Sequence, residues 1–489
     1  MESYGVLSVI PPLLSVALAI YTRNIILALT AGALSGTLIL NHFNPFFAVV
    51  SLMRDHIFVE VSSPSNTQVI IITLIIGGFV NLLEQSGGAK AFSAAMVKLV
   101  SNKIKGQIAT WLSGISVFFS DTANSLIVGP LFRPVFRELK ICREKLAYII
   151  DTTAAPVVIL VPVASWGVYI MSLIENSYSG MGVKADPFTV LLDVWPYQFY
   201  AFLALFAVPM FISTGKDFGP MAAAQKRFLE GLDKTEKVTE KKQEQTKLIV
   251  VILPFAIMVA TLASVLGYYA MTEGVKSVHV NAGLCLSYLF ASMGCAYVMK
   301  RYQKISYDRS MEMFFEGVGN LISVGAILAL AWALSSICRE LETGQYLATL
   351  IGDSLDPRFF PIAVFFFGAM MSFATGSSFG TFAILMATTL PVAHILGADL
   401  ILTIAAILSG GLFGDHTSPI SDTTVLASMG AGCPHIDHVS TQFPYAMIAG
   451  FMTVFAFLLL AFFNSPYVVL FVLVFQYVVI RILMQRYGS

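Results

Sequence analysis

Charged side chains are scarce in this chain of 489 residues, because Asp, Glu, Lys and Arg together make up only 12% of it. Soluble domains carry roughly 25%. The 29 basic residues are balanced by 29 acidic ones, so no basic excess is available to hold a phosphate backbone. These shortages exclude a soluble enzyme, a disordered chain and a nucleic-acid binder.

Cysteine is also sparse, and the signals of cleavage are missing. The five cysteines are scattered, without a CxxC pair or the spacing of metal ligands, so we expect neither a disulfide framework nor a cofactor. The opening 21 residues lack the basic start and small-residue cleavage site of a signal peptide. We interpret them as a first membrane span that is kept.

Apolar residues are abundant instead, at 57% of the sequence against roughly 45–50% in soluble domains. Crossing ~30 Å of hydrocarbon takes about 20 apolar residues in a helix. The sequence therefore predicts an all-α polytopic membrane protein. The expected spans are 3–21, 24–41, 67–86, 146–176, 189–213, 248–270, 279–299, 315–337, 400–429, 443–463 and 466–484.

Two further apolar stretches, 106–134 and 359–392, are interrupted by polar residues. The interruptions read FSDTANS at 119–125 and TGSSFGT at 375–381. They leave arms of about 13–16 residues, which are too short to span at ~1.5 Å per residue. We interpret both stretches as re-entrant hairpins, whose polar tips must be buried in protein or line a wet cavity.

The two hairpins belong to segments that align with each other. Residues 87–135 align with 344–392 without a gap, which places Ser120 on Ser377. Loop 88–105 is basic, whereas its partner 345–362 carries Asp353 and Asp356. Equivalent loops on opposite sides of the membrane are typical of inverted-topology repeats. We predict two such repeats, each with five spans and one re-entrant hairpin, followed by an extra C-terminal span.

Domain boundaries follow from this repeat and from the basic segment 214–247, which we interpret as a flexible cytoplasmic linker. The same rule places the N-terminus outside and the C-terminus in the cytoplasm. The predicted units are a first repeat over 1–213 with hairpin 106–134 and broken span 146–176, the linker 214–247, a second repeat over 248–463 with hairpin 359–392 and broken span 400–429, and the extra span 464–489.

Four acidic residues lie in or beside the broken elements: Asp121, Asp151, Asp415 and Asp422. An ionisable side chain at membrane depth costs roughly 2.5–3.5 kcal/mol, which makes each a functional candidate. Carboxylates, hydroxyls and carbonyls freed by prolines are the oxygen ligands of a hard cation such as Na⁺. We predict that these acids bind Na⁺, and that Na⁺ and H⁺ compete for them.

The pseudo-symmetry arranges the candidate ion- or substrate-binding residues in two sets, with His416 as the one obvious titratable base near them. A single Ser or Thr in either set has an alternative role as a helix cap. The first set is Ser120, Asp121, Thr122 and Asn124 with Asp151, Thr152 and Thr153. The second set is Thr375, Gly376, Ser377, Ser378 and Thr381 with Asp415, His416, Thr417, Ser418 and Asp422.

The charge near the breaks favours a cation, because no Lys or Arg falls in the middle of a span there. Helix N-termini at the hairpin tips could still hold a carboxylate without a basic residue. An anionic solute therefore stays open.

Two patterns suggest other chemistry. Residues 376–380 match the G-x-S-x-G motif of hydrolases, which requires a strand, turn and helix. An intramembrane serine hydrolase using Ser378 and His416 is thus a distant alternative. His435, Asp437 and His438 resemble metal ligands, but no further ligand completes a site. We place them in a solvated cytoplasmic loop over 430–442, as a loop or gate element.

The segment from Gly410 through Asp415, Asp422 and His438 to Tyr445 resembles the NhaC-type Na⁺/H⁺ antiporter family, and residues 119–125 and 151–156 are similar to it too. The resemblance implies a bacterial inner-membrane transporter, not an enzyme, with two opposed re-entrant hairpins and a homodimeric assembly. It implies exchange of Na⁺ for H⁺ across the bilayer by alternating access. Related proteins move small carboxylates or amino acids, so Na⁺- or H⁺-coupled transport of such an organic solute is the alternative.

Overall fold

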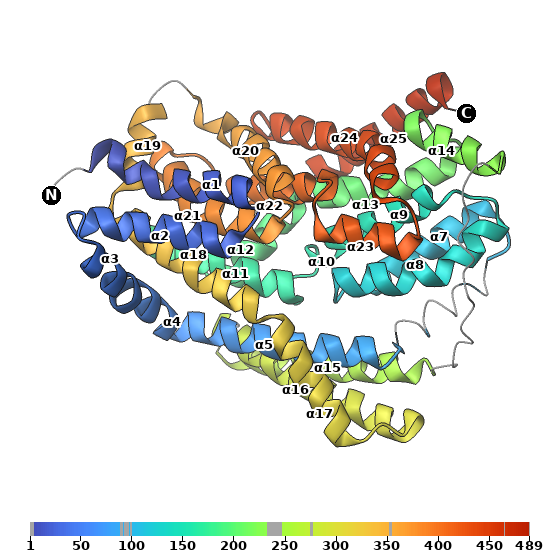
Figure 1. Cartoon of the computed structure of the whole chain (residues 1–489), viewed down its shortest axis with the longest axis horizontal. Coiled ribbons are helices and arrows are strands. Elements are labelled where there is room, and N and C mark those ends of the chain that lie inside the picture. Colours follow the sequence, from blue (N-terminus) through green and yellow to red (C-terminus); the bar gives the residue numbers. More distant parts are fainter. Residues whose placement is uncertain are drawn as a thin grey trace.

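The computed structural model describes residues 4–88, 91, 97, 100–231, 247–273, 277–351, 355–463 and 465–488. Every regular element in these ranges is a helix, and most helices run along the long axis of the molecule (Figure 1). Ten are long and apolar enough to cross a membrane, or twelve if each of two bent pairs is one span. The chain is thus an all-helical, multi-pass membrane protein, as predicted.

The N-terminal region contains more helix than expected. Helix α2 is followed by a bend of 117° into Pro45–Ser62, a helical segment that the hydropathy pattern did not predict. Asn24 and Asn44 begin α2 and α3 by accepting hydrogen bonds from backbone N–H groups of the first turn. The elements are η1 (Gly5–Val9), α1 (Ile10–Thr22), α2 (Ile25–Leu40), α3 (Pro45–Ser51), η2 (Leu52–Ile57), α4 (Phe58–Ser62) and α5 (Pro64–Gln85).

The next region contains the first pair of broken elements. Residues 117–120 separate α7 from α8, and Ala154 interrupts the helix that carries Asp151 just before Pro156. A proline removes a helical N–H and blocks the preceding turn, which explains the second break. The elements are α7 (Lys103–Ser116), α8 (Asp121–Glu138), α9 (Arg143–Thr153), α10 (Ala155–Val158), α11 (Ser165–Met181), α12 (Pro187–Val194), η3 (Trp195–Tyr197), α13 (Phe199–Thr214) and α14 (Gly219–Leu229).

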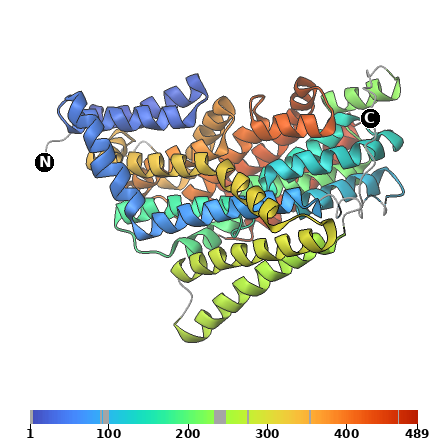
Figure 2. The same cartoon turned by 60° about the horizontal axis from the view of Figure 1, so that its bottom comes forward.

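The remaining helices include the second pair of broken elements, α20–α21 and α22–α23. Helices α15 and α16 project from one side of the molecule, where they appear in yellow-green (Figure 2), and only 17% of the α15 span is buried. The elements are α15 (Ile249–Thr272), α16 (Ser277–Gln303), α17 (Tyr307–Asn320), α18 (Ile322–Glu340), α19 (Thr343–Ile351), η5 (Pro357–Phe359), α20 (Phe360–Thr375), α21 (Ser378–Leu396), α22 (Leu400–Thr417), α23 (Asp422–Ala431), α24 (His435–Leu460) and α25 (Val468–Tyr487).

The arms of the second broken pair are longer than the sequence suggested. Pro357–Thr375 and Ser378–Leu396 have 19 residues each and are apolar enough to cross a membrane, whereas α7 in the first pair has 14 residues. The expected arm length was therefore wrong for the second pair, because η5 runs directly into α20 and α21 continues to Leu396. Its re-entrant character stays a prediction.

Segment 214–247 is not entirely the flexible linker that its charge suggested. Helix α14 lies against the bundle: the Gln225 amide accepts from the N–H of Cys142 at 2.9 Å and donates to the carbonyl of Lys140 at 3.0 Å. Arg227 pairs with Glu144 at 3.3 Å and with Asp437 at 3.8 Å. Residues 232–246 of the predicted linker lie outside the described ranges.

Small residues bring the broken helices into backbone contact. A Cβ atom on Gly430 of α23 would overlap the carbonyl of Ser125 on α8, and one on Gly129 of α8 would overlap Gly430. Gly410 and Gly414 of α22 similarly face the carbonyls of Phe365 and Ala369 on α20. Helices in membranes pack closely where such small residues meet. The contact between α8 and α23 joins the two predicted repeats at their broken elements.

The two hairpin tips also agree locally with the alignment of the repeats. Ser120 precedes α8 and accepts a hydrogen bond from the N–H of Ala123, and Ser377 precedes α21 and accepts one from the N–H of Gly380. Both serines have extended backbone angles, with φ −155° and −145°. The inverted repeat as a whole stays a prediction. The two termini lie at opposite ends of the bundle (Figure 1), and their sides of the membrane also stay predicted.

Candidate functional site

The second hairpin tip meets the break between α22 and α23. Gly376, at φ 65°, turns the chain from α20 into α21, and a Cβ atom there would lie 2.7 Å from the carbonyl oxygen of Ile420. Only glycine combines this left-handed conformation with so close an approach. The Ser418 hydroxyl fastens the same junction by donating to the carbonyl of Phe373 at 2.7 Å.

A cavity of about 390 Å³ opens beside this junction. The N-termini of α2, α8, α21 and α23 all reach it, and three of the predicted acids line it. Helix N-termini carry partial positive charge and stabilise carboxylates. The lining residues include Arg23, Asn24, Asp121, Trp166, Thr375, Gly376, Ser377, Ser378, Asp415, Ile420, Asp422 and Thr423.

Asp415 is the most enclosed acid of this cavity, with 3% of its surface exposed. Its Oδ2 accepts a hydrogen bond from the Ser378 hydroxyl at 2.8 Å. Its Oδ1 has no hydrogen-bond partner within the described part of the chain, and the negative charge of Asp422 lies close enough to repel it. A buried carboxylate oxygen without a partner, next to a cavity, is an available ligand for a cation.

Asp121 and Asp422 lie at the more open part of the same cavity. Asp121 is half-buried and accepts from the N–H of Thr122 at 2.8 Å, and the exposed Asp422 accepts from the N–H of Thr423 at 2.9 Å. The two carboxylates also repel each other. The predicted pairing of Asp121 with Asp151 is therefore not what the structure has, because Asp121 faces the acids of the second half.

One basic residue reaches this cavity, although the sequence suggested none. Arg23 follows α1 and lines the cavity beside Asn24. Arg23 lies between two spans, whereas the prediction concerned only basic residues in the middle of a span. A guanidinium near three carboxylates lowers the net negative charge of the cavity and adds a donor for an anionic group.

Asp151 lies in a separate, enclosed cluster with 1% of its surface exposed. Its Oδ2 accepts from the amide of Gln442 at 2.6 Å and from the hydroxyl of Thr424 at 3.1 Å. The Nε2 atoms of His438 and His416 lie 3.9 Å and 4.0 Å from the same oxygen. Oδ1 has no partner among the described residues. Asp151 of α9 thus sits among side chains of α22, α23 and α24.

The other residues of the first predicted set mostly brace the helices. Asn124 is buried and donates to the carbonyls of Gly114 and Thr153, at 2.9 Å and 2.6 Å, which ties α8 to α7 and α9. Thr153 bonds its own helix at the carbonyl of Ile149. Thr152 does the same at Tyr148 and also lies 3.3 Å from Nε2 of His416. Thr122 is exposed.

In the second set, three hydroxyls are engaged within their own helices. Thr375 donates to the carbonyl of Met371, Thr381 to that of Ser377 and Thr417 to that of Phe413. Of these, only Thr375 also lines the cavity. The capping or bracing alternative therefore describes Thr381 and Thr417, whereas Ser378 contacts the carboxylate of Asp415.

Sequence reasoning missed four residues of the Asp151 cluster, of which Thr424 on α23 is one. The predicted solvated loop over 430–442 is wrong from residue 435 onward, because α24 begins at His435 and buries His438 and Gln442, exposed by 0% and 1%. Their spacing of one helical turn was the available signal, since residues four apart share a face. Tyr200 has no comparable signal; its hydroxyl lies 2.7 Å from Nδ1 of His416.

The geometry gives the hydrolase motif no base. Ser378 bonds Asp415 and the carbonyl of Gly411, while the two ring nitrogens of His416 contact Tyr200 and Thr152. The motif also lies between two helices, α20 and α21, rather than between a strand and a helix. These contacts fit a structural role for the Ser378 hydroxyl at a carboxylate.

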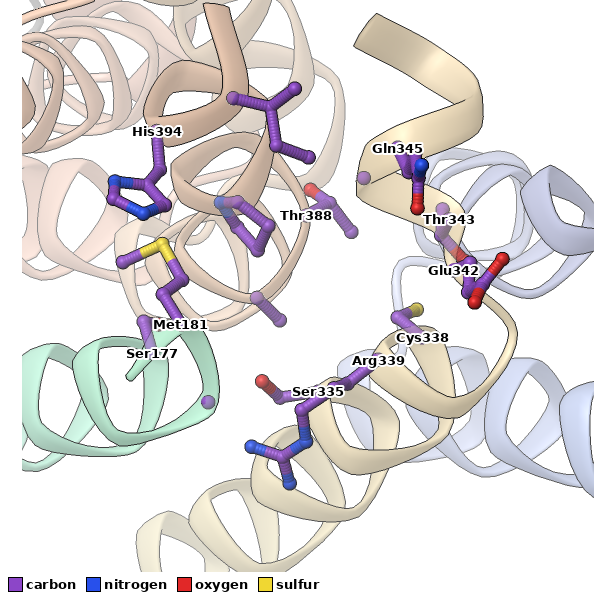
Figure 3. Close-up of a pocket in the computed structure, with 15 residues that line it drawn as sticks. Ser177, Met181, Ser335, Cys338, Arg339, Glu342, Thr343, Gln345, Thr388 and His394 are labelled. Carbon is purple, nitrogen blue, oxygen red and sulfur yellow. The ribbon is translucent and has the colours of Figure 1, made fainter. Parts of the chain in front are cut away.

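A second cavity of about 230 Å³ lies between α11, α18, α19 and α21. Figure 3 shows Ser335, Cys338 and Arg339 of α18 on one side of it and Met181 of α11 and His394 of α21 on the other. Arg339 is paired with Glu60 at 3.6 Å, and Glu60 accepts from Asn176 at 2.9 Å. None of the predicted acids lines this cavity, so we do not assign the ion site to it.

The chain is similar to known membrane transporters. Residues 157–462 match the Na⁺/H⁺ antiporter family. An uncharacterised protein of Haemophilus influenzae is 31% identical over 94% of this chain and 92% of its own length. The malate-2H⁺/Na⁺-lactate antiporter of Bacillus subtilis is 31% identical over 36% of this chain and 37% of its own length.

A solved structure, the YdaH transporter of Alcanivorax borkumensis, covers 85% of both chains with a TM-score of 0.54 at 13% identity. That likeness concerns the fold. The class defined here is a membrane transporter. More particularly, the chain belongs to the Na⁺/H⁺ antiporter family, as the motif over Gly410–Tyr445 indicated.

Proposed function

We propose that this protein exchanges Na⁺ for H⁺ across the bacterial inner membrane by alternating access. The observation that carries the proposal is the cavity beside the hairpin tip, where Oδ1 of Asp415 has no partner among the described residues and Asp121 and Asp422 add two further carboxylates. Carboxylate and hydroxyl oxygens are suitable ligands for a hard cation. Na⁺ is the transported ion here.

Competition for one set of oxygens would couple the two ions. Na⁺ at Asp415 requires an ionised carboxylate, and a proton on the same group removes the charge that holds the cation. The repulsion between Asp415 and Asp422 favours a state in which either Na⁺ or H⁺ is present. An empty, fully charged site is the state of highest energy, and this discourages an uncoupled leak.

Asp151 takes a different role in this proposal. Gln442 and Thr424 already donate to its Oδ2, and two imidazoles lie within 4.0 Å. An enclosed carboxylate with such neighbours is suited to a proton and poorly suited to a hydrated cation. We therefore assign the cation to Asp415, Asp121 and Asp422 and a proton to Asp151. Movement of the hairpins past the other helices would complete alternating access.

Proteoliposomes with an imposed pH gradient test the proposal directly. Na⁺, Li⁺ or K⁺ is added without any organic solute, and a dye follows the internal pH. A collapse of the gradient on cation addition, lost in Asp415→Asn and kept in the exposed-loop control Asp356→Asn, is the expected result. A gradient that no cation changes would overturn the assignment.

Coupled transport of a small carboxylate or amino acid is the second candidate. Arg23 at the cavity favours it, as does a volume of about 390 Å³, which lies within the range of ~300–1,000 Å³ typical of sites for small molecules. The related Bacillus antiporter is named for malate and lactate. A gradient that responds only after carboxylates or amino acids are added would favour this second function. An Arg23→Gln variant that loses only that response would locate the anionic group.

A further inference from the structure

Of the two histidines at the start of α24, His435 has no part in the function proposed so far, and His438 enters it only as a neighbour of Asp151. His435 is partly exposed and His438 is fully buried, and the hydroxyl of Ser428 on α23 lies between them. Ser428 Oγ is 3.0 Å from Nδ1 of His435 and 2.8 Å from Nδ1 of His438. The three side chains form one hydrogen-bonded cluster that ends 3.9 Å from Asp151.

The orientation of Gln442 fixes the hydrogen on one ring of this cluster. Its amide nitrogen is 2.6 Å from Asp151 and 2.7 Å from the carbonyl oxygen of His416. A carbonyl can only accept, so the NH₂ group must face this side. Oε1 of Gln442 therefore faces Nε2 of His438, at 2.9 Å, and Nε2 must carry the hydrogen.

The carbonyl of Pro419 fixes the other ring in the same way. It lies 2.6 Å from Nε2 of His435, and because it too can only accept, Nε2 of His435 must carry a hydrogen. If both imidazoles are neutral, neither Nδ1 then has one. Both bare Nδ1 atoms face Ser428, whose single hydrogen also has the carbonyl of Thr424 within 2.7 Å. The neutral cluster is short of at least one hydrogen.

We propose that His435, Ser428 and His438 form a proton-binding site that supplies the exchange. One added proton on either Nδ1 makes that nitrogen a hydrogen-bond donor to the Ser428 oxygen. A lone pair of this Nδ1 then no longer faces a lone pair of the serine oxygen. The proposal rests on the proposed function in one respect, because the bound proton is the one exchanged for Na⁺. It adds a site for H⁺ outside the cation cavity.

Titratable groups on several helices would interact with a positive charge in the cluster. Asp151 on α9 and the imidazole of His416 on α22 lie on the inner side. Arg227 on α14 pairs with Glu144 on α9 and with Asp437, which follows His435 by two residues on α24. The carboxylate of Asp151 is the group that would offset a positive charge on His438.

Transfer of the proton balances within these residues. Once the two groups approach from 3.9 Å to hydrogen-bonding distance, the N–H bond at Nε2 of His438 breaks and an O–H bond forms on Asp151. The imidazolium becomes a neutral imidazole that keeps the added hydrogen at Nδ1 and leaves Nε2 bare until a proton returns, and the carboxylate becomes a neutral acid. Partly exposed His435 is the point at which the cluster regains a proton from water.

Nitrogen NMR of histidine-labelled protein in lipid bilayers tests the site without any transport. At pH 7.5 and without Na⁺, an ordinary exposed histidine is charged in only about a tenth of molecules. We expect one imidazolium signal that disappears in His438→Gln and in Ser428→Ala and stays in the control His394→Gln. Wild-type protein with only neutral rings, or a signal that survives both cluster variants, would overturn the proposal.

Flux measurements keep this proposal distinct from the proposed function. In proteoliposomes we expect His438→Gln to lower Na⁺-driven proton movement at least ~10-fold while Na⁺ still raises the melting temperature. Unchanged flux in this variant would overturn the site. If wild-type protein shows the imidazolium but no exchange, the proposed function fails and the proton-binding site stands. If it shows exchange but no imidazolium, the proton-binding site fails and the proposed function stands.

Discussion

Asp151 and Asp415 are both buried carboxylates on broken helices, and each keeps one oxygen without a partner among the described residues. They differ in what surrounds the other oxygen. Two donors and two imidazoles enclose Asp151, whereas Asp415 has the Ser378 hydroxyl and then a cavity of about 390 Å³. This difference between the two carboxylates indicates that burial alone does not define an ion site. An accessible space beside an unsatisfied oxygen is also required.

The variant that should distinguish the two acids most clearly is Asp415→Asn, which removes the charge of Asp415. We expect Asp415→Asn to abolish Na⁺ binding, because an amide offers a weaker oxygen and no charge. A ligand at 100 times its dissociation constant stabilises a protein by about 2.7 kcal/mol. Wild-type protein in detergent should thus melt higher in NaCl than in choline chloride, and the variant should melt equally in both. A Na⁺ shift that persists would reject Asp415 as the cation ligand, and Asp356→Asn is the control.

The same change at Asp151 should act on stability instead. In Asp151→Asn the amide oxygen can still accept from both Gln442 and Thr424, but its NH₂ group then replaces Oδ1, which has no partner among the described residues. Leaving a buried donor unsatisfied costs about 1–3 kcal/mol. We expect a lower melting temperature with a Na⁺ shift of wild-type size. Loss of that shift at unchanged stability would place the cation at Asp151.

Contact between α8 and α23 joins the helices that begin at Asp121 and Asp422, the two acids that share the cavity with Asp415, so it offers a third test. A Cβ atom in Gly430→Ala would overlap the carbonyl of Ser125, and overpacking costs roughly 1–3 kcal/mol. Gly325→Ala is the matched control, because its Cβ atom would have nothing within 4 Å among the described residues. We expect lower melting temperature and slower exchange in the first variant only. Equal behaviour of the two would show that the helices can separate there at no cost.

The smallest effects should come from the hairpin caps. Ser120 and Ser377 each accept one backbone hydrogen bond at the start of a helix, and replacing such a cap by alanine costs about 1 kcal/mol. We expect Ser120→Ala and Ser377→Ala to lower stability by similar amounts, as measured by denaturation in detergent. A large loss of Na⁺ binding in Ser377→Ala alone would assign that hydroxyl to the ion rather than to the cap.

Much of the architecture was predictable because the membrane limits what a chain can do. The long apolar runs indicated the helices, and the cost of burying an acid pointed to the four aspartates. The breaks at 117–120 and 376–377 were visible as polar tips within apolar stretches. The contact between Ser378 and Asp415 followed from pairing the second hairpin with the matching span.

The partners of Asp151 could not be predicted in the same way. Thr424 and Gln442 are 273 and 291 residues away from it in sequence, and nothing local indicates that α9 reaches α23 and α24. Residues around Gly432 and Pro434 have the composition of a loop. The sequence therefore did not indicate that a helix begins at His435. Arg23 was missed because it lies between spans, yet the fold brings that turn to the cavity.

Helix α14 has a consequence for how the polypeptide can be made. It belongs to the first half of the chain, but its Arg227 reaches Asp437 and the nearby Asp217 accepts a hydrogen bond from Tyr445 at 2.8 Å, both on α24. Together with the crossing of Gly129 and Gly430, these contacts hold the halves to each other without the peptide bonds of 232–246. Two separately encoded fragments, 1–231 and 247–489, should therefore assemble in one membrane when they are co-expressed.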